Sequence, residues 1–208
     1  MVDAARRRRA AALAGHSGDE ADARSLLADP DSGVRATALG ALGRMGRVGE
    51  DDMRAALADP SAEVRRRACQ VAVGVPAVDL VGMLDDGDAG VVEVAAWALG
   101  ERADAAGDTV ARLSAVAAGH DDPLCREAAV AALGAIGDDR GLPAILAATR
   151  DRPAIRRRAV IALAPFDGPD VEAALVAALD DRDWQVRQAA EDLAPETVAP
   201  ENLAPEGG

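Results

Sequence analysis

Aromatic residues are almost absent from this 208-residue sequence, which has two Trp, one Phe and no Tyr. Strands favour aromatic and β-branched residues, and of these only Val is common here. The apolar half of the composition is mostly Ala, Leu and Val, and Ala is the strongest helix former. This composition argues against a sheet-rich fold. It predicts an all-α protein, long enough to bury a hydrophobic core.

Lysine is missing altogether, so Arg supplies every side-chain cation apart from the two histidines. Asp and Glu together number 36 against 23 Arg, which gives a formal net charge of −13. Nucleic-acid binding depends on clustered cations that release counterions from phosphates. The negative charge of this chain repels nucleic-acid phosphates, so we expect no general affinity for DNA or RNA.

Cysteine and histidine are limited to two residues each. Cys69 and Cys125 form no C-x-x-C motif and lie in apolar helical patterns, so we expect buried free thiols. His16 and His120 are not followed by Glu and lie far apart, which argues against a di-iron site. No local Ser/His/Asp or Cys/His arrangement is present. The sequence therefore predicts no catalytic residue, no metal and no cofactor.

Long apolar runs are also lacking. A basic N-terminal stretch precedes a short apolar segment in "MVDAARRRRAAALAGHSG". That segment is too short for the apolar part of a signal peptide and far too short to span a bilayer. We therefore expect a soluble cytoplasmic protein with no membrane partner.

What the sequence does contain is a segment that recurs about every 30 residues, as in "SGVRATALGALG", "AEVRRRACQVAV" and "PAIRRRAVIALA". We call the apolar residue before the Arg, or its equivalent, the anchor. The anchors are Ala5, Val34, Val64, Val91, Cys125, Ile155 and Val186. Their successive spacings are 29, 30, 27, 34, 30 and 31 residues. Regular spacing of this kind is typical of a repeat array.

Each anchored segment reads as a helix, because the anchor and the residues four and eight positions later are usually apolar. A second apolar stretch, such as "EDDMRAALA" or "VEAALVAAL", precedes each anchor. Turn residues such as Asp-Pro-Ser at 59–61 separate the two helices, and Asp or Ser can cap the second. Glycines are expected at the C-terminal ends of second helices, at Gly43, Gly100 and Gly134.

No single helix pair can bury its apolar face alone, so the pairs must stack. We predict a right-handed α-solenoid of six helix pairs, preceded by a capping helix near residues 2–14. The expected repeats span 19–46, 49–74, 76–102, 105–137, 139–165 and 168–194, in one domain over 1–194. Residues 195–208 are expected to form an acidic, Pro-rich, disordered tail, because Ala-Pro-Glu recurs there every five residues.

The repeated pattern resembles the HEAT-repeat superfamily, and specifically its short bacterial branch, similar to the phycocyanobilin (PBS) lyase HEAT-like repeats. It stands here as "DPDSGVRATALGALG" and covers residues 1 to about 194. Repeat three departs from it, with Val92 in place of the Arg, and the last repeat carries Glu191 and Asp192 on its second helix, as a capping repeat needs. The resemblance implies an armadillo/HEAT-like superhelix. Its members include scaffolds, lyase subunits, DNA glycosylase-like proteins and metal hydroxylases.

An Arg follows most anchors, at Arg6, Arg35, Arg65, Arg126, Arg156 and Arg187. An Asp lies five or six residues upstream in five units, at Asp29, Asp59, Asp121, Asp151 and Asp181. Stacked repeats would align these residues into a structural ladder of alternating Asp and Arg along the turns. Within it we expect Asp59 to pair with Arg65.

The remaining arginines are not required by the pattern. In the resembling proteins the second helices line the concave surface, and positions two and six after the anchor should point there. The candidate protein-binding site comprises Arg66, Arg67, Glu93, Trp97, Glu127, Arg157, Arg158 and Ile161. Trp and Arg are the residue types most enriched at interface hot spots. The alternative is that Trp97 packs between repeats and the arginines only solubilise the chain.

The leading functional hypothesis is a monomeric, non-enzymatic scaffold or adaptor whose concave face binds a protein or peptide. The first alternative is an accessory subunit of a lyase or maturation enzyme. The second is nucleic-acid binding through the Arg-rich second helices, which the net charge disfavours.

Overall fold

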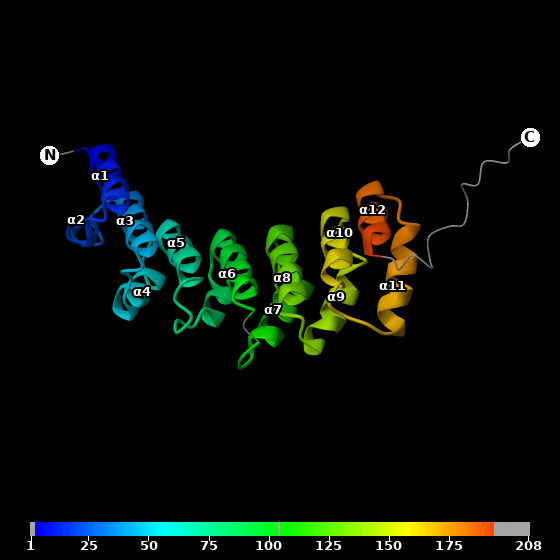
Figure 1. The fold of residues 1–208 in the computed structure, drawn as a ribbon. Helices are drawn as coiled ribbons and strands as arrows, with labels where there is room; N and C mark the ends of the chain where they lie inside the picture. Colours follow the sequence, from blue (N-terminus) through cyan, green and yellow to red (C-terminus); the bar gives the residue numbers. More distant parts are fainter. Residues whose placement is uncertain (1–2, 104, 194–208) are drawn as a thin grey trace, which may run out of the picture.

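The computed structural model describes residues 3–103 and 105–193 of the chain, which are helical and contain no strand (Figure 1). A first helix, α1 (Ala4–Ser17), precedes the helix pairs. The pairs are α2 (Glu20–Ser25) and α3 (Ser32–Met45), α4 (Glu50–Leu57) and α5 (Ala62–Ala72), η1 (Val81–Asp85) and α6 (Ala89–Glu101), α7 (Thr109–Gly119) and α8 (Pro123–Ile136), α9 (Leu142–Ala148) and α10 (Pro153–Ala162), and α11 (Pro169–Leu179) and α12 (Trp184–Leu193). A 3-10 turn, η2 (Asp139–Gly141), leads into α9.

The predicted α-solenoid, with a capping helix before six helix pairs, is confirmed for this part of the chain. The anchors from Val34 in α3 to Val186 in α12 are buried, at 0–3 % exposure, as their periodicity predicts. The predicted first anchor, Ala5, is exposed and is therefore wrong. The prediction of a disordered tail concerns residues that lie outside the described ones.

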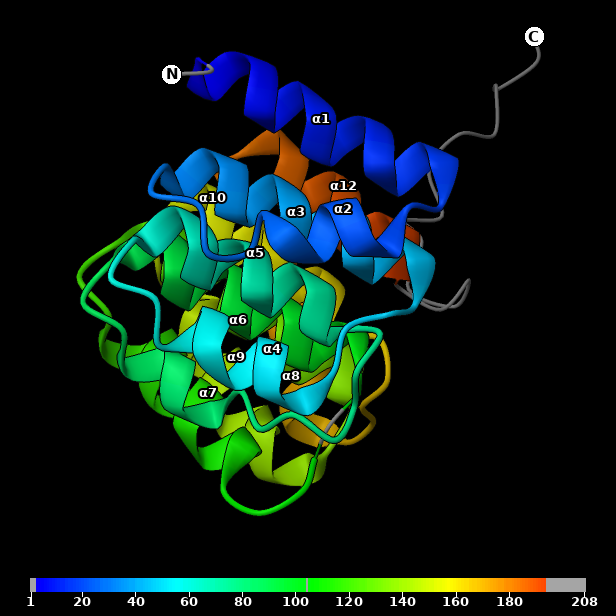
Figure 2. The same cartoon turned by 90° about the vertical axis from the view of Figure 1, so that its left-hand side faces the viewer.

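The helices form two layers (Figure 1). Helices α1, α3, α5, α6, α8, α10 and α12 stand in one row, which we call the inner layer. The array is curved, and these helices lie on its concave side. Helices α2, α4, α7, α9 and α11 lie on the opposite side and form the outer layer. Figure 2 looks along the row and shows the pairs stacked behind one another. One continuous apolar core runs from Ala36 in α3 to Val171 in α11.

Glycines set how closely neighbouring inner-layer helices approach. Gly43, Gly100 and Gly134 lie in the last turns of α3, α6 and α8, near the C-terminal ends where they were expected, but none of them caps its helix. A Cβ on Gly134 would lie 2.7 Å from the Cα of Ala162 in the next helix, and one on Gly100 would lie 2.8 Å from the Cα of Ala132. The left-handed residue that ends α8 is Gly137, with φ 67°.

Repeat three departs from the predicted helix–turn–helix unit. Its first element is η1, a 3-10 helix of five residues, where a full helix was expected. Pro76 and Gly82 interrupt this stretch, and neither residue type supports a helix interior. The second helix, α6, is nevertheless complete and carries the buried anchor Val91.

Candidate functional site

An Arg guanidinium joins most turns of the solenoid to the turn of the next repeat. Arg35 shows the geometry: its Nε and Nη2 donate to the two carboxylate oxygens of Asp59, both at 2.8 Å. Its Nη1 donates to the backbone carbonyl of Asp29 in its own turn, also at 2.8 Å. A fork of this kind fits the planar guanidinium and fixes two repeats relative to one another.

The fork on a carboxylate occurs in five rungs, Arg7–Asp29, Arg35–Asp59, Arg65–Asp86, Arg126–Asp151 and Arg156–Asp181. Hydrogen bonds from the arginines hold the pKa of each of these carboxyl groups below its usual range. The ladder itself is as predicted, but several of its members are not; Arg187, for example, donates only to the carbonyl of Asp181. The first member is Arg7 and not Arg6, and Arg65 pairs with Asp86, whereas Asp59 offers Arg65 only its carbonyl.

One rung is missing at the centre of the array. Val92 stands where the Arg should be, and it is 1 % exposed. In the next turn His120, and not the predicted Asp121, occupies the position of the rung carboxylate. The Nδ1 of His120 accepts the backbone N–H of Asp122 at 3.0 Å, just as Asp59 accepts that of Ser61. Both halves of this rung have therefore changed together, and the turn retains its internal hydrogen bond.

The extra arginines extend along the inner layer in opposite directions. On α5, Arg66 lies over Gly90 at the start of α6, while Arg67 turns back toward Gly40 in α3 and donates to Gln70 at 2.8 Å. On α10, Arg158 turns back toward α8, where its Nη2 lies 3.5 Å from Glu127. Arg66, Arg67, Arg157 and Arg158 all remain at least partly exposed, so solvent reaches their charges.

The centre of the predicted site is a hollow of about 570 Å³ between α6 and α8, which we call the Trp97 groove. It is lined by Gln70, Glu93, Val94, Trp97, Gly100, Glu101, Leu124, Glu127, Arg158 and four alanines of α8. Trp97 is 44 % exposed, which is incompatible with a core residue. Of the predicted residues, Glu93, Trp97, Glu127 and Arg158 meet here. Glu101, Leu124 and Gln70 were not predicted.

Two predicted residues lie in a separate hollow nearer the C-terminus. Arg157 and Ile161 of α10 line about 450 Å³ together with Trp184 and Gln188 of α12. Trp184 is 64 % exposed and was not predicted, because it precedes its anchor by two positions. Arg66 and Arg67 line neither hollow. The predicted site is therefore two hollows on one layer, flanked by arginines.

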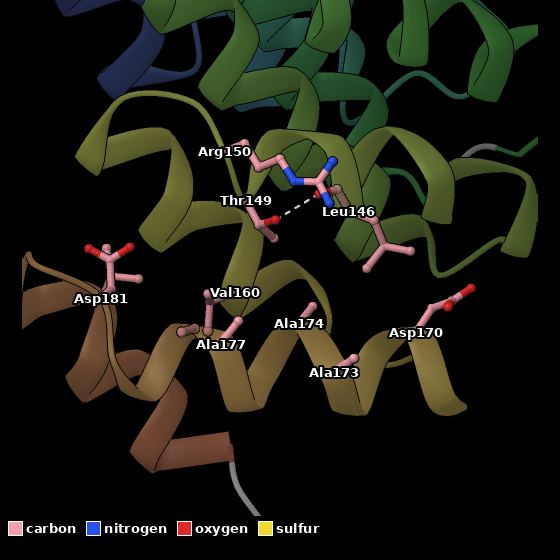
Figure 3. A pocket seen from close by; sticks show the side chains of 11 residues that line it. Leu146, Thr149, Arg150, Val160, Asp170, Ala173, Ala174, Ala177 and Asp181 are labelled. Carbon is pink, nitrogen blue, oxygen red and sulfur yellow. Dashed lines mark hydrogen bonds between the residues drawn. The ribbon is translucent and has the colours of Figure 1, made fainter.

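A third hollow, of about 440 Å³, opens on the outer layer between α9 and α11 (Figure 3). Ala173, Ala174 and Ala177 of α11 face Leu146 of α9 and Thr149, which follows that helix, across it. The Thr149 hydroxyl donates to the carbonyl of Leu146 at 2.7 Å and is thereby occupied. Alanine side chains are too short to fill the space between these two helices, which explains the hollow.

The two thiols are buried and unpaired, as predicted. Burial raises the pKa of Cys69 to about 12 and that of Cys125 to about 11. Both therefore stay protonated at neutral pH, and a thiol is a poor nucleophile and metal ligand in that form. No group of three or more His, Cys, Asp or Glu residues in 3–103 and 105–193 is placed to hold a metal ion. No helix within those ranges is long and apolar enough to cross a membrane.

Two family models match adjacent parts of the chain. Residues 77–154 match the model for HEAT repeats, and residues 155–181 match that for the PBS lyase HEAT-like repeat. No curated protein matches the chain by sequence. The matched segments include both faces of the Trp97 groove.

Solved structures show the same fold at low sequence identity. The Escherichia coli protein YibA is 20% identical over 84% of this chain and 72% of its own, with a TM-score of 0.60. An engineered protein is 18% identical over 83% and 94% of the two chains, with a TM-score of 0.60. A designed armadillo repeat protein in complex with the peptide (KR)4 is 17% identical over 81% and 95%, with a TM-score of 0.56.

Proposed function

Because this chain belongs to the HEAT-repeat proteins, with family models matching residues 77–181, we propose that it is a non-enzymatic scaffold that binds a protein or peptide on its inner layer. Stacked repeats form an extended curved surface, which such proteins use for binding. The observation that carries the proposal is the exposed Trp97 in a groove of that layer.

The distribution of exposed apolar side chains supports the choice of layer. Six large apolar side chains are exposed among the described residues: Leu13, Trp97, Leu124, Ile161, Val176 and Trp184. Only Val176 belongs to the outer layer, and four of the others line the two inner hollows. Exposed apolar surface that gathers on one side of a protein marks an interaction site. A Trp in a hollow is the residue type best suited to anchor a partner.

A second candidate function is an accessory subunit of a lyase, which the match of residues 155–181 to the PBS lyase HEAT-like repeat favours. In that role the same inner layer would bind the catalytic subunit. Nucleic-acid binding is not proposed, because the exposed arginines of the inner layer alternate with carboxylates and the net charge is −13.

Partner capture with matched variants tests the scaffold proposal. The full chain, Trp97→Ala and the outer-layer control Val176→Ala are immobilised, and captured proteins are quantified by mass spectrometry. Candidates lost only with Trp97→Ala are purified and their affinities measured by calorimetry. We expect Trp97→Ala to weaken binding about ten-fold or more, as at a hot spot. Equal capture by all three proteins would contradict the proposal, as would a Tm loss of several degrees in Trp97→Ala alone.

A further inference from the structure

Partly or fully exposed charges at the middle of the inner layer differ in sign between its helices. Helix α5 presents Arg66 and Arg67, α6 presents Glu93 and Glu101, α8 presents Glu127, and α10 presents Arg157 and Arg158. A segment that crosses the middle of the layer therefore meets positive, negative, negative and positive helices in that order. The two negative helices are those that form the Trp97 groove.

The carboxylates of the groove surround its aromatic side chain. Glu93, Trp97 and Glu101 are spaced four residues apart on α6, so they lie on the same face of that helix. The carboxylates of Glu93 and Glu101 make no hydrogen bond or ion pair with other described residues. Glu127, on the facing helix, has only the long contact of 3.5 Å with Arg158. The groove thus holds three carboxylates, one Arg and an exposed indole.

We propose that the Trp97 groove binds Lys or Arg side chains of the partner, and that acidic residues on either side of them meet the arginines of α5 and α10. This inference rests on the proposed scaffold function. A cation over the face of an indole is attracted by the ring, and the apolar stem of Lys or Arg can cover Leu124 and the alanines of α8. The free carboxylates accept charge-assisted hydrogen bonds from the same cation.

The spacing of the helices sets the length of the segment. From α5 to α10 the layer includes three helix-to-helix steps of roughly 10 Å each. An extended segment advances about 3.3 Å per residue, so about nine residues cross all four helices. The predicted partner segment therefore carries its cations in the middle and its acidic residues about four positions to each side.

Two synthetic ten-residue peptides of equal composition test this charge order. One has four lysines between two pairs of glutamates, and the other has four glutamates between two pairs of lysines, with a glycine at each junction. Both have zero net charge, so the acidic field of the chain favours neither. Each peptide carries an uncharged fluorescent label, and binding is followed by anisotropy at low salt. The lysine-centred peptide should bind at least about five-fold more tightly, because it can form a few exposed ion pairs, of up to about 1 kcal/mol each, that the other peptide cannot.

Variants locate the preference. Glu93→Gln with Glu101→Gln should remove it, whereas Glu50→Gln with Glu172→Gln, an equal charge change on the outer layer, should leave it intact. Equal affinity for the two peptides, a reversed preference, or a preference that survives Glu93→Gln with Glu101→Gln overturns the inference. Equal affinities that are both lost in Trp97→Ala overturn the charge order alone and leave the scaffold proposal standing. If neither peptide binds, the inference is overturned, and partner capture separately decides the scaffold function.

Discussion

Removing the guanidinium of Arg156 should destabilise the C-terminal part of the solenoid. Arg156 is the only buried arginine among the described residues, at 6 % exposure. It donates to Asp181 at 2.8 and 2.7 Å and to the carbonyl of Asp151 at 3.0 Å. Arg156→Ala removes all three bonds and leaves a carboxylate and a carbonyl at the interface between two repeats.

The size of the effect depends on the hydrogen bonds and solvent contact that the Asp181 carboxylate and the Asp151 carbonyl keep after the substitution. A hydrogen bond to a charged group contributes about 1.5–3 kcal/mol, and breaking a fully buried ion pair costs about 3–5 kcal/mol. The Asp181 side chain is 15% exposed and keeps its bond to the N–H of Asp183, so water and the turn compensate in part. We therefore expect a loss of about 2 kcal/mol in the free energy of unfolding. For a chain of this length that is a fall in Tm of about 6 °C.

Thermal and urea unfolding followed by circular dichroism measure this loss. The control is Arg157→Ala, which removes the neighbouring exposed Arg and should change stability by less than about 0.5 kcal/mol. A double-mutant cycle with Asp181→Ala isolates the pair, and a coupling of about 1 kcal/mol or more is expected. If Arg156→Ala is as stable as Arg157→Ala, the ladder does not stabilise the repeats and the reasoning is refuted. Additive losses from Arg156→Ala and Asp181→Ala would refute it equally.

Three further predictions concern the ladder and the helix contacts. Installing the missing rung with Val92→Arg and His120→Asp should give a double variant more stable than the sum of its single changes; additive urea midpoints would contradict this. Gly134→Val should cost about 3 kcal/mol, because its Cβ would lie 2.7 Å from the Cα of Ala162; an unchanged urea midpoint would be inconsistent with that contact. The lowered pKa of Asp181 means that its stabilisation is complete above about pH 4 and is lost at lower pH as the carboxylate is protonated. The stability difference between the natural chain and Asp181→Asn should therefore shrink between pH 7 and pH 3, and a constant difference would disagree.

The fold could be predicted from the sequence because each repeat restates the same local chemistry. The anchors from Val34 onwards lie in a 3.6-residue apolar pattern, and the turns between helices contain Asp, Pro and Gly. The prediction failed where the pattern is weak. Four consecutive arginines at 6–9 leave the register of α1 undetermined by one residue, so the sequence favours Arg6 although Arg7 forms the rung. The short η1 was missed because the apolar residues around it resemble a helix face.

The ladder partners could not be predicted from separation in sequence alone. Arg65 lies six residues after Asp59 and 21 residues before Asp86, and the shorter separation favours the wrong pair. In the structure the nearer Asp offers its carbonyl, because its carboxylate is directed toward the preceding repeat, where it meets Arg35. The same limit applies to the groove. Periodicity placed Trp97 on its wall, but Leu124 joins it only because α8 lies beside α6.

The missing rung and the Trp97 groove share the same two helices, and this has a structural consequence. Between α6 and α8 no Arg–Asp fork joins the described turns. The two repeats are held instead by side-chain packing, by the close approach of Gly100 to Ala132, by the Cys125 thiol, which donates to the carbonyl of Ala89 at 3.1 Å, and by the ion pair of Arg112 with Asp85. Gly100 and Ala132 also line the groove. The contact between Gly100 and Ala132 is therefore part of the groove lining next to Trp97. Because Gly100 lacks a side chain, α8 can lie close enough for Leu124 and Glu127 to face the indole, and the width of the groove follows from that contact.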